Sequence, residues 1–173
     1  ILNVAEKNDA AKNLANIMSR GTSVRKEGYS KYNKIYEFDY EIPRLGRCQM
    51  IMTSVSGHLF NYDFTGTHRQ WNGCDPSSLF NAPVIKTCQQ DQMKIKQTLE
   101  REARKCNNLI IWTDCDREGE NIGFEIIQVC REANRSIQVH RARFSEITNQ
   151  AVQRAINNLV EPDKKVSDAV DVR

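Results

Sequence analysis

The sequence predicts an α/β fold with a central, mainly parallel sheet, and two segments of similar layout carry that prediction. In residues 109–120, an apolar run of strand length ends in three alternating carboxylates, and a helical pattern follows at once. Residues 1–18 have the same order of strand, acidic residue and helix. Because ligands of such sheets bind beyond the carboxyl ends of the strands, we expect both sets of acids at one functional edge. A chain of 173 residues is long enough for one domain with a well-formed core.

The first unit begins with a predicted strand over residues 1–5, which ends at Glu6. Asn8 or Asp9 can cap the helix that follows. The apolar residues of this helix recur at helical spacing and are Ala11, Leu14, Ala15 and Met18. The basic stretch that continues to residue 34 is predicted to be a loop.

The middle of the chain is predicted to hold a β-hairpin and an irregular insertion, together residues 35–90. Alternating residues at 35–40 and a second strand-like run at 48–55 predict the two strands of the hairpin. Residues 61–84 are rich in Gly, Pro, Asn and Asp, which favours an irregular surface excursion. Its expected local anchors are Trp71 and Phe80.

The last part of the chain alternates between helical and strand patterns. Residues 92–106 predict a polar helix whose apolar residues are too sparse for a deeply buried face. The helix after the central strand has an apolar side made of Ile122, Ile126, Val129 and Cys130. Residues 136–144 alternate as a strand. Thr148 can cap the last predicted helix, which Pro162 ends.

Charge distribution is more informative than net charge. A net charge of +3 is too small on its own to indicate nucleic-acid binding, but basic residues flank an acidic segment. They are Arg20, Arg25, Lys26, Lys31 and Lys34 in one stretch and Arg131, Arg135, Arg141 and Arg143 in another. This pattern suits a polyanion whose phosphate is bridged by a cation, although ordinary surface charge is the simpler explanation for any single residue. No apolar run approaches the roughly 20 residues needed to cross a bilayer.

The cysteines indicate the redox compartment of the protein, and the first residues indicate whether the chain is complete. The six cysteines form no C-x-x-C pair and have no histidine at zinc spacing, which favours free thiols in a reducing interior, nuclear or cytosolic. The chain opens inside a strand-like segment without Met and shows no signal peptide. We therefore expect a fragment of a longer protein.

Asp114, Asp116 and Glu118 are the candidate metal ligands. Residues i and i+2 of an extended segment point the same way, so these carboxylates can converge where the strand ends. Two unit charges about 4 Å apart repel by roughly 1 kcal/mol in water and roughly 4 kcal/mol at an effective dielectric near 20. Such a cluster must take up protons, spread into solvent or hold a hard cation such as Mg²⁺. The alternative is a solvated acidic helix start, which the helix dipole also favours.

An acid after the first strand, Glu6, and a later D-x-D motif that starts at Asp114 together resemble the Toprim domain of topoisomerases, primases and related nucleases. Five local strings, in the same order, further resemble the alpha branch of the eukaryotic DNA topoisomerase III family, whose members are type IA enzymes. These strings lie at residues 4–7, 53–59, 112–122, 141–148 and 167–173. The resemblance implies a Rossmann-like Toprim domain over residues 1–160, with the hairpin and insertion at 35–90, and a segment at 161–173 that leads to the next domain.

The resemblance also implies a chemistry. A type IA topoisomerase breaks and rejoins one DNA strand through a tyrosine that would lie outside this chain, so the fragment alone is expected to be inactive. Glu6 would be the general acid and base, and Lys7 would stabilise the scissile phosphate. The ligands of Mg²⁺ would be Asp114, Asp116 and Glu118. The expected DNA contacts are His58, Arg141 and Arg143. Glu120 would either support the metal ligands from behind or be a surface acid of its helix, and the second interpretation is favoured.

The implied substrate is single-stranded DNA, and the implied partners are a RecQ-family helicase and a small OB-fold subunit, in the nucleus with the mitochondrion as a second location. Two alternatives stay open. In a phosphotransferase of the haloacid dehalogenase type, the first aspartate of D-x-D is a nucleophile, but it usually lies in the opening strand, and the late position of Asp114 counts against this. The other alternative is a non-catalytic DNA- or partner-binding module whose acids are structural.

Overall fold

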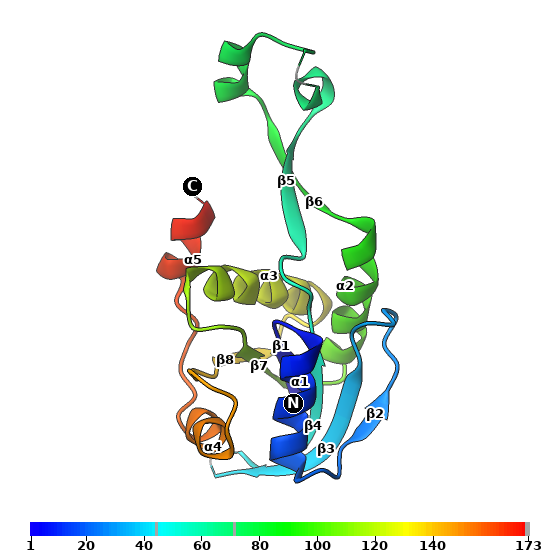
Figure 1. Cartoon of the computed structure of the whole chain (residues 1–173), viewed down its shortest axis with the longest axis vertical. Coiled ribbons are helices and arrows are strands. Elements are labelled where there is room, and N and C mark those ends of the chain that lie inside the picture. The colour runs from blue at the N-terminus through cyan, green and yellow to red at the C-terminus, as the bar shows by residue number, and fades with distance from the viewer. Residues whose placement is uncertain (44, 71, 172–173) are drawn as a thin grey trace.

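The computed structural model describes residues 1–43, 45–70 and 72–171, and its centre is a six-stranded sheet (Figure 1). The strand order is β2-β3-β4-β1-β7-β8. The bounds are β1 Leu2–Ala5, β2 Val24–Lys26, β3 Ile35–Ile42, β4 Gly46–Ser54, β7 Asn108–Trp112 and β8 Gln138–Arg141. The β4, β1, β7 and β8 strands are parallel, whereas β3 pairs with β2 and β4 in antiparallel fashion. The predicted α/β fold with a mainly parallel sheet is confirmed.

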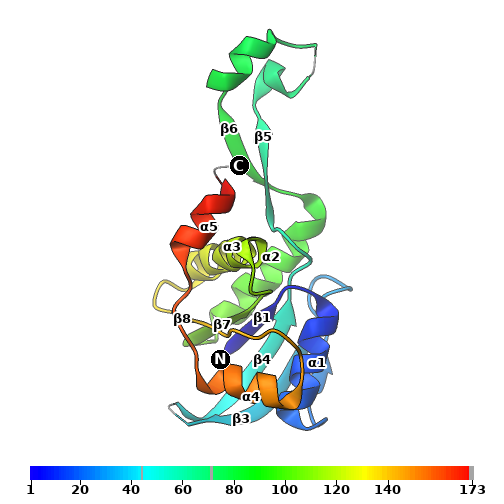
Figure 2. The same cartoon turned by 60° about the vertical axis from the view of Figure 1, so that its left-hand side comes forward.

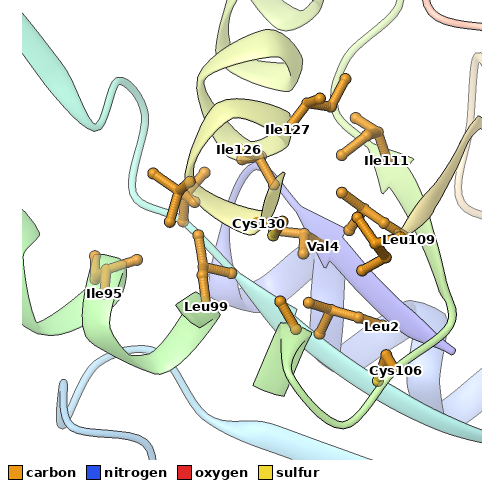
Figure 3. Close-up of a cluster of buried hydrophobic side chains, with 14 of the residues drawn as sticks. Leu2, Val4, Ile95, Leu99, Cys106, Leu109, Ile111, Ile126, Ile127 and Cys130 are labelled. Carbon is orange, nitrogen blue, oxygen red and sulfur yellow. The ribbon is translucent and has the colours of Figure 1, made fainter. Parts of the chain in front are cut away.

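Helices cover both faces of the sheet, and each face has its own apolar core (Figure 2). Their bounds are α1 Asn8–Ser19, α2 Gln90–Ala103, α3 Arg117–Ala133, α4 Asn149–Asn157 and α5 Lys164–Asp171. Because side chains alternate along a strand, Val4 packs beneath α2 and α3 whereas Trp112 packs beneath α1 and α4. Figure 3 shows the first of these cores around Leu99 and Ile126. The central strands are mainly apolar because both of their faces are covered, and the buried Asn3 of β1 is satisfied by accepting a hydrogen bond from Nε1 of Trp112 at 3.0 Å.

The hairpin predicted in the segment 35–90 is present, because β3 and β4 pair in antiparallel register from Tyr36↔Met52 to Ile42↔Gly46. β3 and β4 belong to the central sheet, because β4 pairs in parallel with β1 from Leu2↔Ile51 to Ala5↔Ser54. The part that projects is a separate two-stranded sheet of β5 (Phe60–Phe64) and β6 (Val84–Cys88), which we call the arm (Figure 1). Two 3₁₀ helices lie between its strands, at Gly66–Arg69 and Pro76–Asn81. The prediction of a wholly irregular excursion is therefore wrong at both of its ends.

Phe80 does not anchor the arm. Its side chain is 92 % exposed, so the prediction for this residue is wrong, and Trp71 lies outside the described residues. An aromatic residue in a two-stranded arm has no second layer to pack against, which the local sequence cannot reveal.

The α2 helix is more buried than its polar sequence predicts. Ile95, Leu99 and Ala103 recur every fourth residue and are buried, so one narrow stripe is enough to seat the helix on the sheet. Glu102 is also buried on this helix, where its carboxylate pairs with Arg101 at 2.6 Å and Lys105 at 2.9 Å. The prediction that this helix lacks a deeply buried face is therefore wrong.

A helix cap, the buried cysteines and the polarity of the helices agree with the predictions from the sequence. Thr148 caps α4 as predicted, since its hydroxyl accepts a hydrogen bond from the backbone N–H of Ala151. Cys106 and Cys130 are free thiols within the core, and burial raises the pKa of both. In the described part of the chain, every helix is too short or too polar to cross a bilayer.

Candidate active site at the carboxyl ends of the strands

The parallel strands β1 and β7 end together, which brings Glu6 beside Asp114. Ala5 and Trp112 are partners in the sheet, so the residues that follow them emerge at the same edge. The backbone N–H of Asp114 donates a hydrogen bond to Oε2 of Glu6 at 3.2 Å. Residues that are far apart in the sequence thus share one rim, as the common layout of the two units predicts.

Glu6 and Lys7 occupy the short connection between β1 and α1. The side chain of Glu6 is 15 % exposed, whereas that of Lys7 is 69 % exposed. The Nζ of Lys7 lies 3.8 Å from Oε1 of Glu6. One carboxylate oxygen of Glu6 therefore accepts from the Asp114 backbone, and the other faces the cation of the exposed Lys7 side chain.

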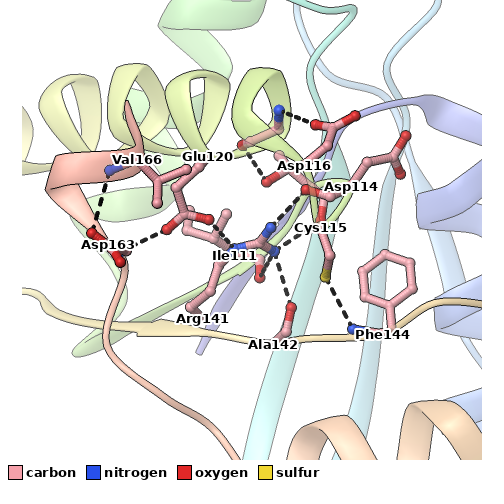
Figure 4. Close-up of polar contacts among 12 residues, drawn as sticks. Ile111, Asp114, Cys115, Asp116, Glu120, Arg141, Ala142, Phe144, Asp163 and Val166 are labelled. Atoms are coloured by element: carbon pink, nitrogen blue, oxygen red, sulfur yellow. Dashed lines mark hydrogen bonds and ion pairs between the residues drawn. The ribbon is translucent and has the colours of Figure 1, made fainter. Parts of the chain in front are cut away.

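The turn between β7 and α3 fixes the two aspartates (Figure 4). Asp116 is the N-cap of α3, and its Oδ1 accepts a hydrogen bond from the backbone N–H of Gly119 at 2.7 Å. A Cβ at Gly119 would lie 2.0 Å from the carbonyl oxygen of Asp114, so the turn requires glycine. The hydroxyl of Thr113 also donates to the carbonyl of Gly119 at 2.6 Å.

The three predicted metal ligands are all exposed, but they do not gather at one point. Over the described ranges, no three His, Cys, Asp or Glu side chains form a group that could hold a metal ion. Asp116 turns one oxygen toward the start of α3, and Glu118 continues into the first helical turn, where it meets His58. The alternation that predicted convergence stops at Asp116, because the helix begins there. Their exposed carboxylate oxygens are nevertheless the donors that a hard divalent cation prefers.

His58 lies at the same rim between two glutamates. Its Nε2 is 3.2 Å from Oε2 of Glu118, and its Nδ1 is 3.4 Å from Oε1 of Glu125. Glu125 is buried in α3 and also accepts the backbone N–H of Leu59 at 2.7 Å. Sequence reasoning missed Glu125, although an acid inside the apolar stretch of α3 was the available signal. The predicted contact between His58 and DNA stays a prediction.

Arg141 does not lie on the surface, and the prediction that it contacts DNA is wrong. Its side chain is 1 % exposed, and its Nε donates to Glu120 at 3.0 Å. Its terminal nitrogens donate to the backbone carbonyls of Thr113, Asp114 and Ala142 at 2.8–2.9 Å (Figure 4). The guanidinium therefore binds the backbone of the acid-bearing turn from the interior of the protein. The cause is that β8 ends at Arg141, so the alternation with Arg143 breaks there.

Glu120 is likewise not the surface acid that was expected. It is 6 % exposed, and its second oxygen accepts the backbone N–H of Asp163 at 2.7 Å. A buried ion pair is tolerated only when its remaining donors and acceptors are satisfied, and here each partner has further hydrogen bonds. Arg143 remains exposed and lines a pocket of about 270 Å³ with Asp116 and Arg117.

Two features of this mainly parallel sheet are typical of one class of catalytic α/β domain. A glutamate follows its first strand, and an acidic turn follows the neighbouring strand. The model of the Toprim domain family matches residues 1–147, and the chain belongs to this family. The match ends at residue 147, so the domain boundary predicted between residues 160 and 161 stays a prediction.

Curated relatives narrow the comparison. The chain is 58 % identical over 173 residues to DNA topoisomerase 3-alpha of Homo sapiens, and this match covers 100 % of the chain and 17 % of the human protein. It is equally identical to DNA topoisomerase 3-alpha of Drosophila melanogaster, of which it covers 14 %. The chain thus spans less than a fifth of these relatives. Full-length topoisomerase I from Thermotoga maritima shares the fold, with a TM-score of 0.60 and 21 % identity over 100 % of this chain and 23 % of that one.

Proposed function

We propose that this chain is the Toprim half of the active site of a type IA DNA topoisomerase of the 3-alpha kind. It would supply a general acid and base and a set of cation-binding carboxylates for breaking and rejoining one DNA strand. The observation that supports this most is the hydrogen bond between the Asp114 backbone and Glu6, which joins two distant acidic motifs at one rim. The attacking tyrosine belongs to a part of the enzyme outside this chain, so the chain is half of a site.

Glu6 has the position that proton transfer requires. In strand breakage its carboxyl group would protonate the departing 3′ oxygen, and in rejoining its carboxylate would take that proton back. One of its oxygens is held by the Asp114 backbone, which orients the group, while the rim leaves the carboxyl partly open to solvent. Lys7 is exposed beside it and would stabilise the charge that develops on the scissile phosphate.

Asp114, Asp116 and Glu118 are the residues that would hold Mg²⁺. The bound cation would supply neutralisation of phosphate charge next to Glu6. The close approach of Gly119 and the hydrogen bond from Arg141 both hold the backbone of Asp114, and this supports a ligand role for its side chain. The Asp116 oxygen that does not cap α3 remains available as a ligand.

The substrate and surroundings follow from the same proposal. Single-stranded DNA would cross the rim, with His58 and the exposed Arg143 as further contacts. A RecQ-family helicase and an OB-fold subunit would be the partners, and the nucleus, with the mitochondrion as a second location, the compartment. The similarity to topoisomerase 3-alpha supports DNA as the substrate.

Replacement of Glu6 by glutamine in a full-length enzyme that carries this chain tests the proposal. Glutamine keeps the hydrogen bond from Asp114 but cannot transfer a proton, so single-strand cleavage products should fall by at least about 100-fold. Cleavage of a labelled oligonucleotide measures this. Glu41→Gln is the matched control, since Glu41 lies near the far end of β3, and it should cleave normally.

Two results would contradict the proposal. Normal cleavage by the Glu6→Gln enzyme would remove the acid–base role. Relaxation of supercoiled DNA by the 173-residue chain alone would show that the chain holds a whole active site. The haloacid dehalogenase alternative is not favoured by the family match, and it predicts a beryllium fluoride adduct at Asp114.

A further inference from the structure

A groove next to the candidate active site takes no part in the chemistry assigned above. It has a volume of about 690 Å³ and lies between residues 29–33 and the start of α2, with Ser56 between them. Topology places it at the same edge as Glu6. β3 is antiparallel to β4, so the connection from β2 to β3 lies where β4 ends. The groove is therefore a neighbour of the rim over which a DNA strand would pass.

Two exposed tyrosines line this groove, and a cation lies against each ring. The side chain of Tyr32 is 70 % exposed and that of Tyr29 is 52 % exposed. Nζ of Lys31 is 4.9 Å from the ring centroid of Tyr32, and the guanidinium carbon of Arg101 is 4.6 Å from that of Tyr29. Large exposed rings beside positive charges are the elements from which proteins build stacking platforms for unpaired bases.

The loop that carries the tyrosines is held firmly. Asn33 is buried, and its Nδ2 donates to the carbonyl of Ser54 at 3.0 Å and to the hydroxyl of Ser56 at 3.2 Å. The backbone N–H of Tyr29 donates to the hydroxyl of Thr98 in α2 at 3.0 Å. These hydrogen bonds thus hold the loop that carries the two rings against β4 and α2.

The same loop is joined to the first residue of α1, close to Glu6 in the sequence. The backbone N–H of Lys34 donates to Oδ1 of Asn8 at 3.0 Å, and Asn8 is two residues beyond Glu6. Ser56 also lies two residues before His58 in the segment that follows β4. A DNA strand bound at Glu6 would therefore have the groove beside it along the same edge of the sheet.

We propose that this groove binds unpaired bases of the single strand that flanks the scissile phosphate, with bases stacked on Tyr29 and Tyr32. Lys31 on the loop wall and Lys94 on the α2 wall would contact phosphates, while Asp91, near Lys94 on α2, keeps the DNA backbone away from the first turn of that helix. Only unpaired bases have free faces, so the groove selects single strands over duplexes without selecting sequence. This subsite rests on the proposed function and identifies where its substrate lies.

Fluorescence of 2-aminopurine tests the subsite in a full-length enzyme that carries this chain. An oligonucleotide with 2-aminopurine at successive positions beside the cleavage site should show quenching at one or two positions. Tyr32→Ala should abolish that quenching and Tyr32→Phe should keep it, because only the ring is needed. The Tyr29→Ala/Tyr32→Ala enzyme should bind single strands about tenfold more weakly, and duplexes with unchanged affinity. Tyr62→Ala, at another exposed tyrosine, is the control and should bind as the unmodified enzyme does.

A second measurement reports the phosphate contact. Lys31→Gln should reduce the slope of log K against log salt concentration by about 0.7 for single-stranded DNA. Quenching that survives Tyr32→Ala, equal loss for single strands and duplexes, or an unchanged slope would each overturn the subsite. The Glu6→Gln enzyme separates the proposed subsite from the proposed acid–base role of Glu6. If it loses cleavage while no position is quenched, the subsite fails alone; if it cleaves normally while quenching is seen, the assigned chemistry fails alone.

Discussion

At the scale of single residues, Arg141 determines the form of the candidate site without reaching its surface. Its planar guanidinium satisfies one carboxylate and several backbone carbonyls at once, which the point charge of a lysine cannot do. Among these carbonyls are those of Thr113 and Asp114, so the position of the acid-bearing turn depends on a buried cation. This role explains why an arginine near the predicted site is not available to a phosphate.

Replacement of Arg141 by methionine should strongly destabilise the chain. The change leaves Glu120 buried without its charged partner, a loss typically of about 3–5 kcal/mol in the free energy of unfolding. Urea unfolding of the 173-residue chain measures it. The exposed Arg143→Met variant should change that free energy by less than about 0.5 kcal/mol. Equal effects at the two positions would show that the buried pair contributes nothing.

At the scale of elements, the turn from β7 to α3 is the part that the sequence describes best and the chain tolerates least. The apolar strand and the helix that follows it are recognisable locally, and the structure has both where the sequence predicts them. Gly119 is needed because its Cα passes directly against the Asp114 carbonyl. The turn leaves no room there for a Cβ.

Gly119→Ala should therefore destabilise the protein and move the Asp114 carbonyl away from Arg141. The overpacking cost is expected to be about 1–3 kcal/mol, even though alanine is the better helix former. Thermal unfolding and amide chemical shifts at residues 113–116 measure the two effects. Gln128→Ala, on the exposed side of the same helix, should leave both unchanged. A Gly119→Ala protein of normal or higher stability would contradict the close approach.

Elements differ in how far their own sequence predicts them. The sequence predicts β1 and β7 because each is a mainly apolar run of strand length, and it predicts α1 and α3 because their apolar residues recur at helical spacing. α2 and Glu120 were misjudged because their burial depends on surfaces contributed by distant segments. The meeting of Glu6 and Asp114 was predictable from the rule that parallel strands end at one edge. The burial of Arg141 was not, since residues 160–163 cover it from elsewhere in the chain.

At the scale of the whole molecule, the arm is separate from the two cores. β5 and β6 form their own two-stranded sheet, and the arm extends well away from the helices that cover the central sheet (Figure 1). Tyr62, Phe80 and Val84 are all more than half exposed along it. The arm therefore adds surface to the molecule, while the stability of the molecule depends on the sheet and its covering helices.

Removal of the arm should leave the rest of the protein folded. In this variant residues 62–86 are replaced by Asn-Gly, a two-residue turn that joins the paired residues Asn61 and Thr87. The midpoint of thermal unfolding should shift by less than about 4 °C, which corresponds to roughly 1 kcal/mol for a chain of this size. Circular dichroism measures the transition. Loss of a single cooperative transition would show that the arm belongs to the core.

The contacts of Arg141 also tie the candidate site to the last helix. The backbone of Arg141 exchanges hydrogen bonds with Val160, and Glu120 holds the N–H of Asp163, from which the chain enters α5. A continuous series of hydrogen bonds and one ion pair therefore runs from the residue that precedes α5, through Glu120 and Arg141, to the carbonyl of Asp114. A partner that binds α5 would thus contact an element that is connected to the acidic rim through the interior of the protein.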